Sequence, residues 1–266
     1  MQTFGDLRLA VLIDADNVPY SNIKGMMEEI ALYGTPTFKR IYGDWTKPSL
    51  SGWKTVLLEN AITPVQQYSY TTGKNSTDSA MIIDAMDILY SGKVDGFCLV
   101  SSDSDFTRLA TRLREAGMKV IGIGERKTPN AFIVACDKFI YLEIIKNSSQ
   151  KKENGNLDMS KTKKVKLKNT VEENEEAKAK SAVIDLISSS IANLADDNGW
   201  AFLGDVGNLI LKKHPDFDPR NYGFQKLTPL IKALDSFEID ERETGKPHVK
   251  HIYIRNKNGK CDQGNC

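Results

Sequence analysis

The stretch Leu9-Ala10-Val11-Leu12-Ile13-Asp14-Ala15-Asp16-Asn17 joins five consecutive apolar residues to a polar group. A short apolar run without alternation is typical of a strand covered on both faces, as in a parallel sheet between helices. It therefore predicts a buried strand whose carboxyl end carries two acidic side chains.

The same pattern recurs through residues 1–145. Five more apolar runs predict strands at 37–42, 62–68, 96–100, 120–123 and 139–142. Helical patterns lie between these runs, with apolar residues spaced as in Ile82, Ala85, Met86 and Leu89. This alternation predicts an α/β fold with a doubly wound parallel sheet.

Residues 146–178 lose the pattern, since they contain many lysines, then several glutamates, and no aromatic residue. They predict a disordered charged linker, which either touches nucleic acid through its basic half or serves only as a tether.

Residues 179–256 predict a second, smaller domain. Helical stripes occur near 183–194, 206–210 and 224–234, followed by strand-like runs at 237–239 and 251–254. Three helices and a hairpin predict a winged helix, followed by a polar tail over 257–266.

Composition excludes several classes of protein. The 266 residues carry a net charge of +1, so an argument for a nucleic-acid or membrane partner must be local. No apolar run reaches the ~18 residues of a membrane-spanning helix, and the N-terminus does not resemble a signal peptide. Four cysteines without a CxxC motif argue against a disulfide scaffold or a zinc module and favour the reducing cytoplasm.

Acidic residues follow two of the predicted strands. Asp14 and Asp16 follow the first strand, and Asp103 and Asp105 follow the fourth. Ligands of open parallel sheets bind beyond the carboxyl ends of the strands, where the strand order reverses. If the first and fourth strands are neighbours, the two acidic groups meet at one edge.

Asp78 lies four residues before Ile82, on the predicted buried stripe of its helix. It should therefore point along the same sheet edge. Asp84 and Asp87 fall off that stripe and are expected in solvent.

Several carboxylates in one partly buried place repel one another unless a counter-charge is present. A hard divalent cation, Mg²⁺ or Mn²⁺, supplies that charge, lowers the pKa of a bound water and steadies a leaving oxygen. The chemistry indicated is phosphodiester hydrolysis. Helix capping is the better explanation for any one of these acidic groups alone, but three groups at one edge are much less expected from capping. A DxD after the first strand also occurs in aspartyl phosphatases, which place Thr or Val where this sequence has Asn17.

Three motifs resemble those of NYN domains, a branch of the PIN-like nucleases: residues 11–18, 74–78 and 101–106. The resemblance implies a metal-dependent endoribonuclease in which Asp14, Asp78, Asp103 and Asp105 are both catalytic and metal-binding. It also implies that Asn17 holds the first loop or a metal-bound water, and Asn17 is counted among the expected substrate-binding residues. Asp44 is a weaker candidate for a further acid, with a turn residue as the alternative.

Basic and aromatic residues near these motifs are candidates for substrate binding, and Lys74 is the best placed of them. The others are Lys39, Arg40, Lys47 and Lys54 for phosphates, and Trp45, Tyr68 and Tyr70 for stacking on unpaired bases. A surface charge or a core aromatic is the alternative at each position.

The segments 199–207, 214–217 and 221–227 resemble the LOTUS or OST-HTH domain, which accompanies NYN domains in limkain-like and bacterial proteins. The resemblance implies RNA recognition or docking of a protein partner. Tyr222 is expected to open a helix that carries Lys226 and Lys232. The hairpin adds the basic residues Arg242, Lys246, Lys250 and Arg255.

The sequence thus predicts an Mg²⁺- or Mn²⁺-dependent endoribonuclease acting on RNA, with single strands as the expected form. The alternatives are a non-catalytic RNA-binding adaptor and a nuclease that cleaves DNA. The oligomeric state is not indicated.

Overall fold

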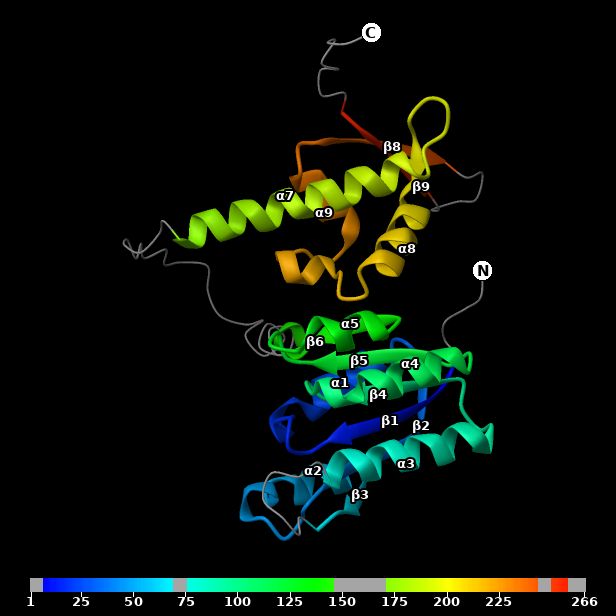
Figure 1. The fold of residues 1–266 in the computed structure, drawn as a ribbon. Coiled ribbons are helices and arrows are strands. Elements are labelled where there is room, and N and C mark those ends of the chain that lie inside the picture. The colour runs from blue at the N-terminus through cyan, green and yellow to red at the C-terminus, as the bar shows by residue number, and fades with distance from the viewer. Residues whose placement is uncertain (1–6, 69–75, 146–170, 244–249, 258–266) are drawn as a thin grey trace. The chain divides into compact units, whose positions relative to one another are not determined.

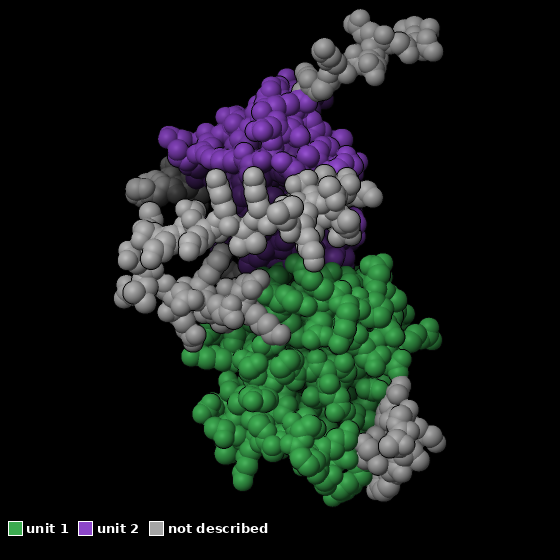
Figure 2. Space-filling model, turned by 90° about the vertical axis from the view of Figure 1, so that its left-hand side faces the viewer, with its two compact units in different colours: residues 1–157 green, residues 158–266 purple. Residues whose placement is uncertain are grey.

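A computed structural model of the protein describes residues 7–68, 76–145, 171–243 and 250–257. The chain divides into two compact units, residues 1–157 and 158–266 (Figure 2). The division falls inside the stretch predicted as a linker. Each unit has its own apolar core.

The first unit contains a six-stranded parallel sheet with the order β3-β2-β1-β4-β5-β6 (Figure 1). Its strands are β1 (Arg8–Asp14), β2 (Thr35–Gly43), β3 (Thr63–Gln66), β4 (Gly96–Val100), β5 (Lys119–Gly124) and β6 (Lys138–Tyr141). All six predicted strands are confirmed, and so is the doubly wound α/β class. The order reverses between β1 and β4, which are neighbours, so their carboxyl ends share one edge.

Helices cover both faces of this sheet, which explains the continuous apolar run of β1. Leu9, Val11 and Ile13 pack against one helical layer, whereas Ala10 and Leu12 face the other; all five are fully buried. The first layer consists of α1 (Ile23–Ile30) and α2 (Trp53–Glu59). The second consists of α3 (Ser76–Ser91), α4 (Thr107–Glu115) and α5 (Asn130–Ala135).

Helix α3 is rotated relative to the sequence prediction. Its fully buried residues are Met81, Ala85 and Ile88, and the predicted Ile82, Met86 and Leu89 are only partly buried. The prediction that Asp84 lies in solvent is wrong. Its carboxylate accepts hydrogen bonds from the Arg40 guanidinium and the Tyr42 hydroxyl of β2. Asp87 is exposed, as expected.

Asp84→Asn should lower the free energy of unfolding by about 1–2 kcal/mol, because it weakens two partly buried hydrogen bonds to a charged acceptor. Denaturant unfolding measures this cost. Asp87→Asn, an exposed change on the same helix, is the matched control and should stay within about 0.5 kcal/mol of wild type. Equal effects of the two substitutions would contradict a stabilising role for the contact between β2 and α3.

The second unit has three helices, α7 (Val171–Ala192), α8 (Leu203–Lys213) and α9 (Leu227–Ala233), in its described part. Strands β7 (Ala201–Phe202), β8 (Phe237–Glu243) and β9 (Lys250–Asn256) form an antiparallel sheet with the order β7-β9-β8. Val183, Ile187 and Ile191 form the buried stripe of α7. This smaller domain of helices and a hairpin agrees with the predicted winged helix.

The predicted linker is partly helical. Helix α7 begins at Val171, so the prediction of disorder is wrong for residues 171–178. Their sequence is rich in glutamate, alanine and lysine, which are good helix formers, and it runs directly into the buried stripe of the helix. Residues 146–170 and 258–266 lie outside the described residues.

Tyr222 does not open a helix that carries Lys226. Tyr222 ends a short 3-10 helix, Pro219–Tyr222, and Gly223 follows with a φ of 84°. Such a backbone conformation suits glycine and ends the helix. Lys226 then lies at the N-cap of α9, in the next segment of the chain.

None of the helices in the described part of the chain combines the length and hydrophobicity that are needed to cross a membrane.

Candidate metal centre

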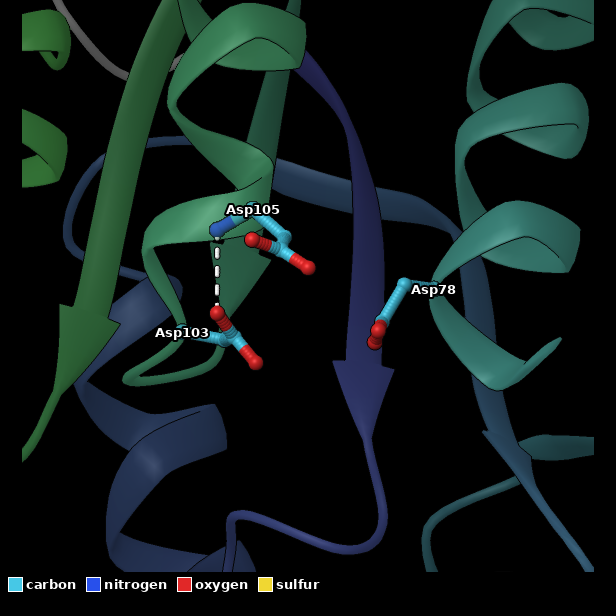
Figure 3. A group of neighbouring side chains, drawn as sticks. All are labelled: Asp78, Asp103 and Asp105. Atoms are coloured by element: carbon cyan, nitrogen blue, oxygen red, sulfur yellow. Dashed lines mark hydrogen bonds between the residues drawn. The ribbon is translucent and has the colours of Figure 1, made fainter. Parts of the chain in front are cut away.

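Three carboxylates converge at the carboxyl edge of the parallel sheet (Figure 3). Asp78 lies in the first turn of α3, whereas Asp103 and Asp105 lie in the segment that follows β4. One oxygen from each lies within 4.8 Å of the other two. We call these three residues the acid cluster. Asp78 and Asp103 are partly buried and Asp105 is exposed.

The chain after β4 is shaped by its own polar groups. Asp103 precedes a short 3-10 helix, Ser104–Phe106, and its Oδ1 accepts a hydrogen bond of 2.9 Å from the Asp105 backbone N–H. The Ser101 hydroxyl oxygen accepts the Asp103 N–H at 3.1 Å. The buried ring of Phe106 anchors the segment against the sheet. Helix capping and clustering of acids therefore occur together at Asp103.

Asp14 lies beside the acid cluster, at the end of β1, and its side chain is buried. Its carboxylate accepts hydrogen bonds from the Ser101 hydroxyl at 3.0 Å, the Asp16 N–H at 3.0 Å and the Asn17 amide. The structure thus brings three of the four predicted acids directly together. The fourth acid is adjacent to them and is engaged with the loops after β1 and β4.

The acids repel one another. Burial raises the pKa of Asp78 to about 6, and the negative charges of Asp14, Asp103, Asp105 and Asp16 add to the shift. Burial also raises the pKa of Asp14, although its hydrogen bonds from Asn17 and Ser101 oppose that change. Part of the site therefore tends to hold protons when no counter-charge is present.

A divalent cation fits this donor set. Carboxylate oxygens are the preferred ligands of Mg²⁺ and Mn²⁺, and a cation among them favours the charged form that burial and repulsion disfavour. Asp78, Asp103 and Asp105 are the residues that could hold the ion. Asp14 is adjacent to them, and its carboxylate could contribute to the same set.

Asn17 bonds to Asp14, so it holds the first loop, one of the two roles considered for it. Asp44 is buried at the end of β2 and accepts hydrogen bonds from the Thr46 N–H, the Thr46 hydroxyl and the Gln66 amide. Its contacts are those of a turn residue. Ser101 joins Asp14 to Asp103, a role that the sequence did not predict. Two signals marked it in the sequence, its position directly after a buried strand and its place in the motif 101–106.

The predicted phosphate contacts differ in their surroundings. Arg40 pairs with Asp84, and Lys39 donates to the Asn60 carbonyl. Lys47 lies 3.8 Å from the Asp16 carboxylate. Lys74 and Tyr70 lie outside the described residues.

The predicted stacking residues differ too. Tyr68 is exposed, whereas the Trp45 indole N–H donates to the Val65 carbonyl and its ring packs against the core.

Most basic side chains of the hairpin are paired within the second unit. Arg242 pairs with Asp240, and Arg255 pairs with Glu238. Lys250 and Lys232 both lie near Glu241. Lys246 lies outside the described residues. Tyr222 and Lys226 are exposed, and the Tyr222 ring lies 6.0 Å from that of Phe217.

Residues 8–143, just over half of the chain, match the model of the NYN domain family. The chain belongs to the NYN family. Residues 175–249 match the OST-HTH/LOTUS domain. NYN is a family of nuclease domains and LOTUS domains bind RNA, so the chain joins a nuclease domain that contains an acid cluster to a domain of an RNA-binding family.

Among solved structures, the chain is similar to a protein of unknown function from Vibrio parahaemolyticus, with 22% identity and a TM-score of 0.43, over 52% of this chain and 94% of that one. It is also similar to an uncharacterized protein from Nitrosomonas europaea, with 36% identity and a TM-score of 0.27, over 30% of this chain and 78% of that one. A protein from Chromobacterium violaceum matches with 36% identity and a TM-score of 0.25, over 29% of this chain and 83% of that one. No curated protein matches.

The raised pKa of Asp78 predicts a pH-dependent stability without metal. Between the ordinary pKa of 3.8 and about 6, the folded protein keeps a proton that the unfolded chain releases. Stability therefore falls as pH rises through this window and stays low above it. At pH 8 in EDTA, Asp78→Asn should be more stable than wild type by about 1 kcal/mol, a reduced value because solvent screens a half-exposed carboxylate.

Thermal unfolding at pH 4 and pH 8 measures this effect, and the gain from Asp78→Asn should shrink at pH 4. Asp87→Asn should show no such dependence. A less stable Asp78→Asn protein at pH 8 would show that repulsion does not dominate this site.

Proposed function

We propose that the protein is an Mg²⁺- or Mn²⁺-dependent endoribonuclease that hydrolyses phosphodiester bonds in RNA. The observation that carries the proposal is the convergence of Asp78, Asp103 and Asp105 beside Asp14 at the strand-order reversal of an NYN sheet. This is the edge at which open parallel sheets bind their ligands.

In the proposed mechanism, Asp78, Asp103 and Asp105 hold the ion, and Asp14 completes the set. When bound, the ion supplies a positive charge at the phosphate and lowers the pKa of an attacking water. Asp14 also holds the loops after β1 and β4 together, because it accepts hydrogen bonds from Asn17 and Ser101. The mechanism needs neither a histidine nor a cysteine nucleophile.

RNA is the proposed substrate because the second domain belongs to an RNA-binding family. Tyr222 and Lys226 are proposed to contact it, the ring by stacking on an unpaired base and the ammonium group at a phosphate. Their exposure supports this role, as does the pairing of most hairpin cations with acids. Lys74, just before Asp78 in the sequence, is kept as a proposed phosphate contact.

The two described cysteines support a proposal for the cellular compartment. Cys98 and Cys136 are free thiols buried in the core of the first unit. Free thiols suit the reducing cytoplasm, where we propose that the enzyme acts.

Asp103→Asn should abolish metal-dependent cleavage of single-stranded RNA and leave the fold intact, since the amide oxygen can still cap the 3-10 helix but carries no charge for the ion. The assay compares labelled RNA and matched DNA in Mg²⁺, Mn²⁺ and EDTA, with Asp87→Asn as the active control. Cleavage by Asp103→Asn at the wild-type rate would show that the metal site is misplaced. If the wild-type protein cleaved DNA alone, the proposed substrate would be wrong. If it bound RNA tightly but cleaved it in neither metal, the protein would be an adaptor.

Tyr222→Ala should weaken RNA binding about tenfold, because stacking on an aromatic ring contributes about 1–3 kcal/mol per base. Fluorescence anisotropy with the Asp103→Asn protein measures binding without cleavage. Tyr222→Phe keeps the ring and its packing on Phe217, so it should bind like the parent. Unchanged affinity of Tyr222→Ala would move the role of this surface from RNA to a protein partner.

A further inference from the structure

Lys47 lies beside Asp16, whose N–H donates to the buried Asp14 carboxylate next to the acid cluster. Its Nζ is 3.8 Å from Oδ1 of Asp16, and both side chains are partly exposed, at 42% and 44%. Asp16 is one of the acids whose charge raises the pKa of Asp78. The ammonium group is thus linked through Asp16 to Asp14, and it is accessible from solvent.

The turn that carries Lys47 is held on both sides. The buried Asp44 carboxylate accepts three hydrogen bonds, from Thr46 and from Gln66 of β3. The Lys47 N–H donates to the Asp44 carbonyl at 3.0 Å, and the Lys47 carbonyl accepts the Leu50 N–H at 3.1 Å. The backbone of Lys47 is therefore fixed, while its side chain can move.

Asp16 is held in a similar way, because its N–H donates to Oδ1 of Asp14. The contact between Asp16 and Lys47 therefore joins two neighbouring turns, one after β1 and one after β2. Each turn is organised by a buried aspartate at the end of its strand, Asp14 or Asp44. This arrangement places a cation beside the site without placing it among the metal-binding acids.

A polyanionic substrate needs such a cation, because a group of carboxylates repels phosphates. Of the other cations expected to contact phosphate, Arg40 is paired with Asp84 and Lys39 with a backbone carbonyl. Lys54 is exposed on α2, and Lys74 lies outside the described residues. The pair of Lys47 and Asp16 is a weak one, because solvent screens both partly exposed charges. Exchange of Asp16 for a phosphate oxygen is therefore inexpensive.

We infer that Lys47 binds a non-bridging phosphate oxygen of the RNA backbone next to the scissile bond and leaves Asp16 when the substrate enters. The inference rests on the proposed function, since it names the group that positions the substrate at the same site. Lys47 binds the phosphate ester and takes no part in making or breaking bonds.

The test compares Lys47→Ala with Lys24→Ala, an exposed lysine of α1, in the full chain. Binding of single-stranded RNA to Asp103→Asn proteins is measured in EDTA over a range of salt concentrations. Loss of one phosphate contact should make the slope of log K against log salt shallower by about 0.7, and Lys24→Ala should leave it unchanged. In the active protein, Lys47→Ala should raise KM about fivefold and change kcat less.

A second comparison separates phosphate binding from a purely structural pairing. If Lys47 only holds Asp16 in place, Lys47→Ala should have no effect once Asp16→Asn is present. If Lys47 binds phosphate, its effect should persist in that background. An unchanged salt slope, or loss of the effect with Asp16→Asn, overturns the inference. Absence of cleavage by wild type in every metal would refute the proposed function, whereas the salt slope in EDTA would still decide the role of Lys47.

Discussion

The buried carboxylate of Asp14 links the two loops on which the candidate site depends. It binds the Ser101 hydroxyl after β4 and the Asp16 N–H and Asn17 amide after β1. Because Ser101 also accepts the Asp103 N–H, the position of Asp103 depends indirectly on Asp14. Burial of a carboxylate is costly, and its three donors offset much of that cost. Asp14 therefore holds the two loops together and also adds negative charge to the site.

The clustered carboxylates lower the stability of the metal-free protein, and they are also the groups that could bind a metal ion. Burial raises the pKa of Asp78 to about 6, and the charges of Asp103 and Asp105, whose oxygens lie within 4.8 Å of it, and of the nearby Asp14 and Asp16 add to the shift. The same charge density that destabilises the metal-free fold provides the oxygen donors that a divalent cation prefers. Binding of the cation would therefore contribute to folding as well as to catalysis. In the proposed function, Lys47 would complement this arrangement, because it would attract the phosphate from its place beside Asp16.

The second unit distributes its charges differently. Its hairpin cations are paired with acids of the same sheet, and Arg242 and Arg255 also lie over the Trp200 ring. These contacts stabilise the small domain and reduce the positive field of the hairpin. Exposed Tyr222 and Lys226, separated by the turn at Gly223, are the more suitable groups for an extended partner. The acid cluster thus belongs to the first unit, and the exposed Tyr222 and Lys226 belong to the second.

The sequence by itself determined the six strands, the two-domain order and the identity of the clustered acids. A strand buried on both faces must be apolar along its whole length, and residues that follow adjacent parallel strands must share an edge. Only the tertiary structure decided the rotation of α3, the pairing of Asp84 with Arg40 and Tyr42, and the separate position of Asp14. It also showed that Lys47 lies beside Asp16 whereas Arg40 is paired with Asp84. These features depend on which side chains meet across elements that are distant in the chain, and local periodicity carries no information about such encounters.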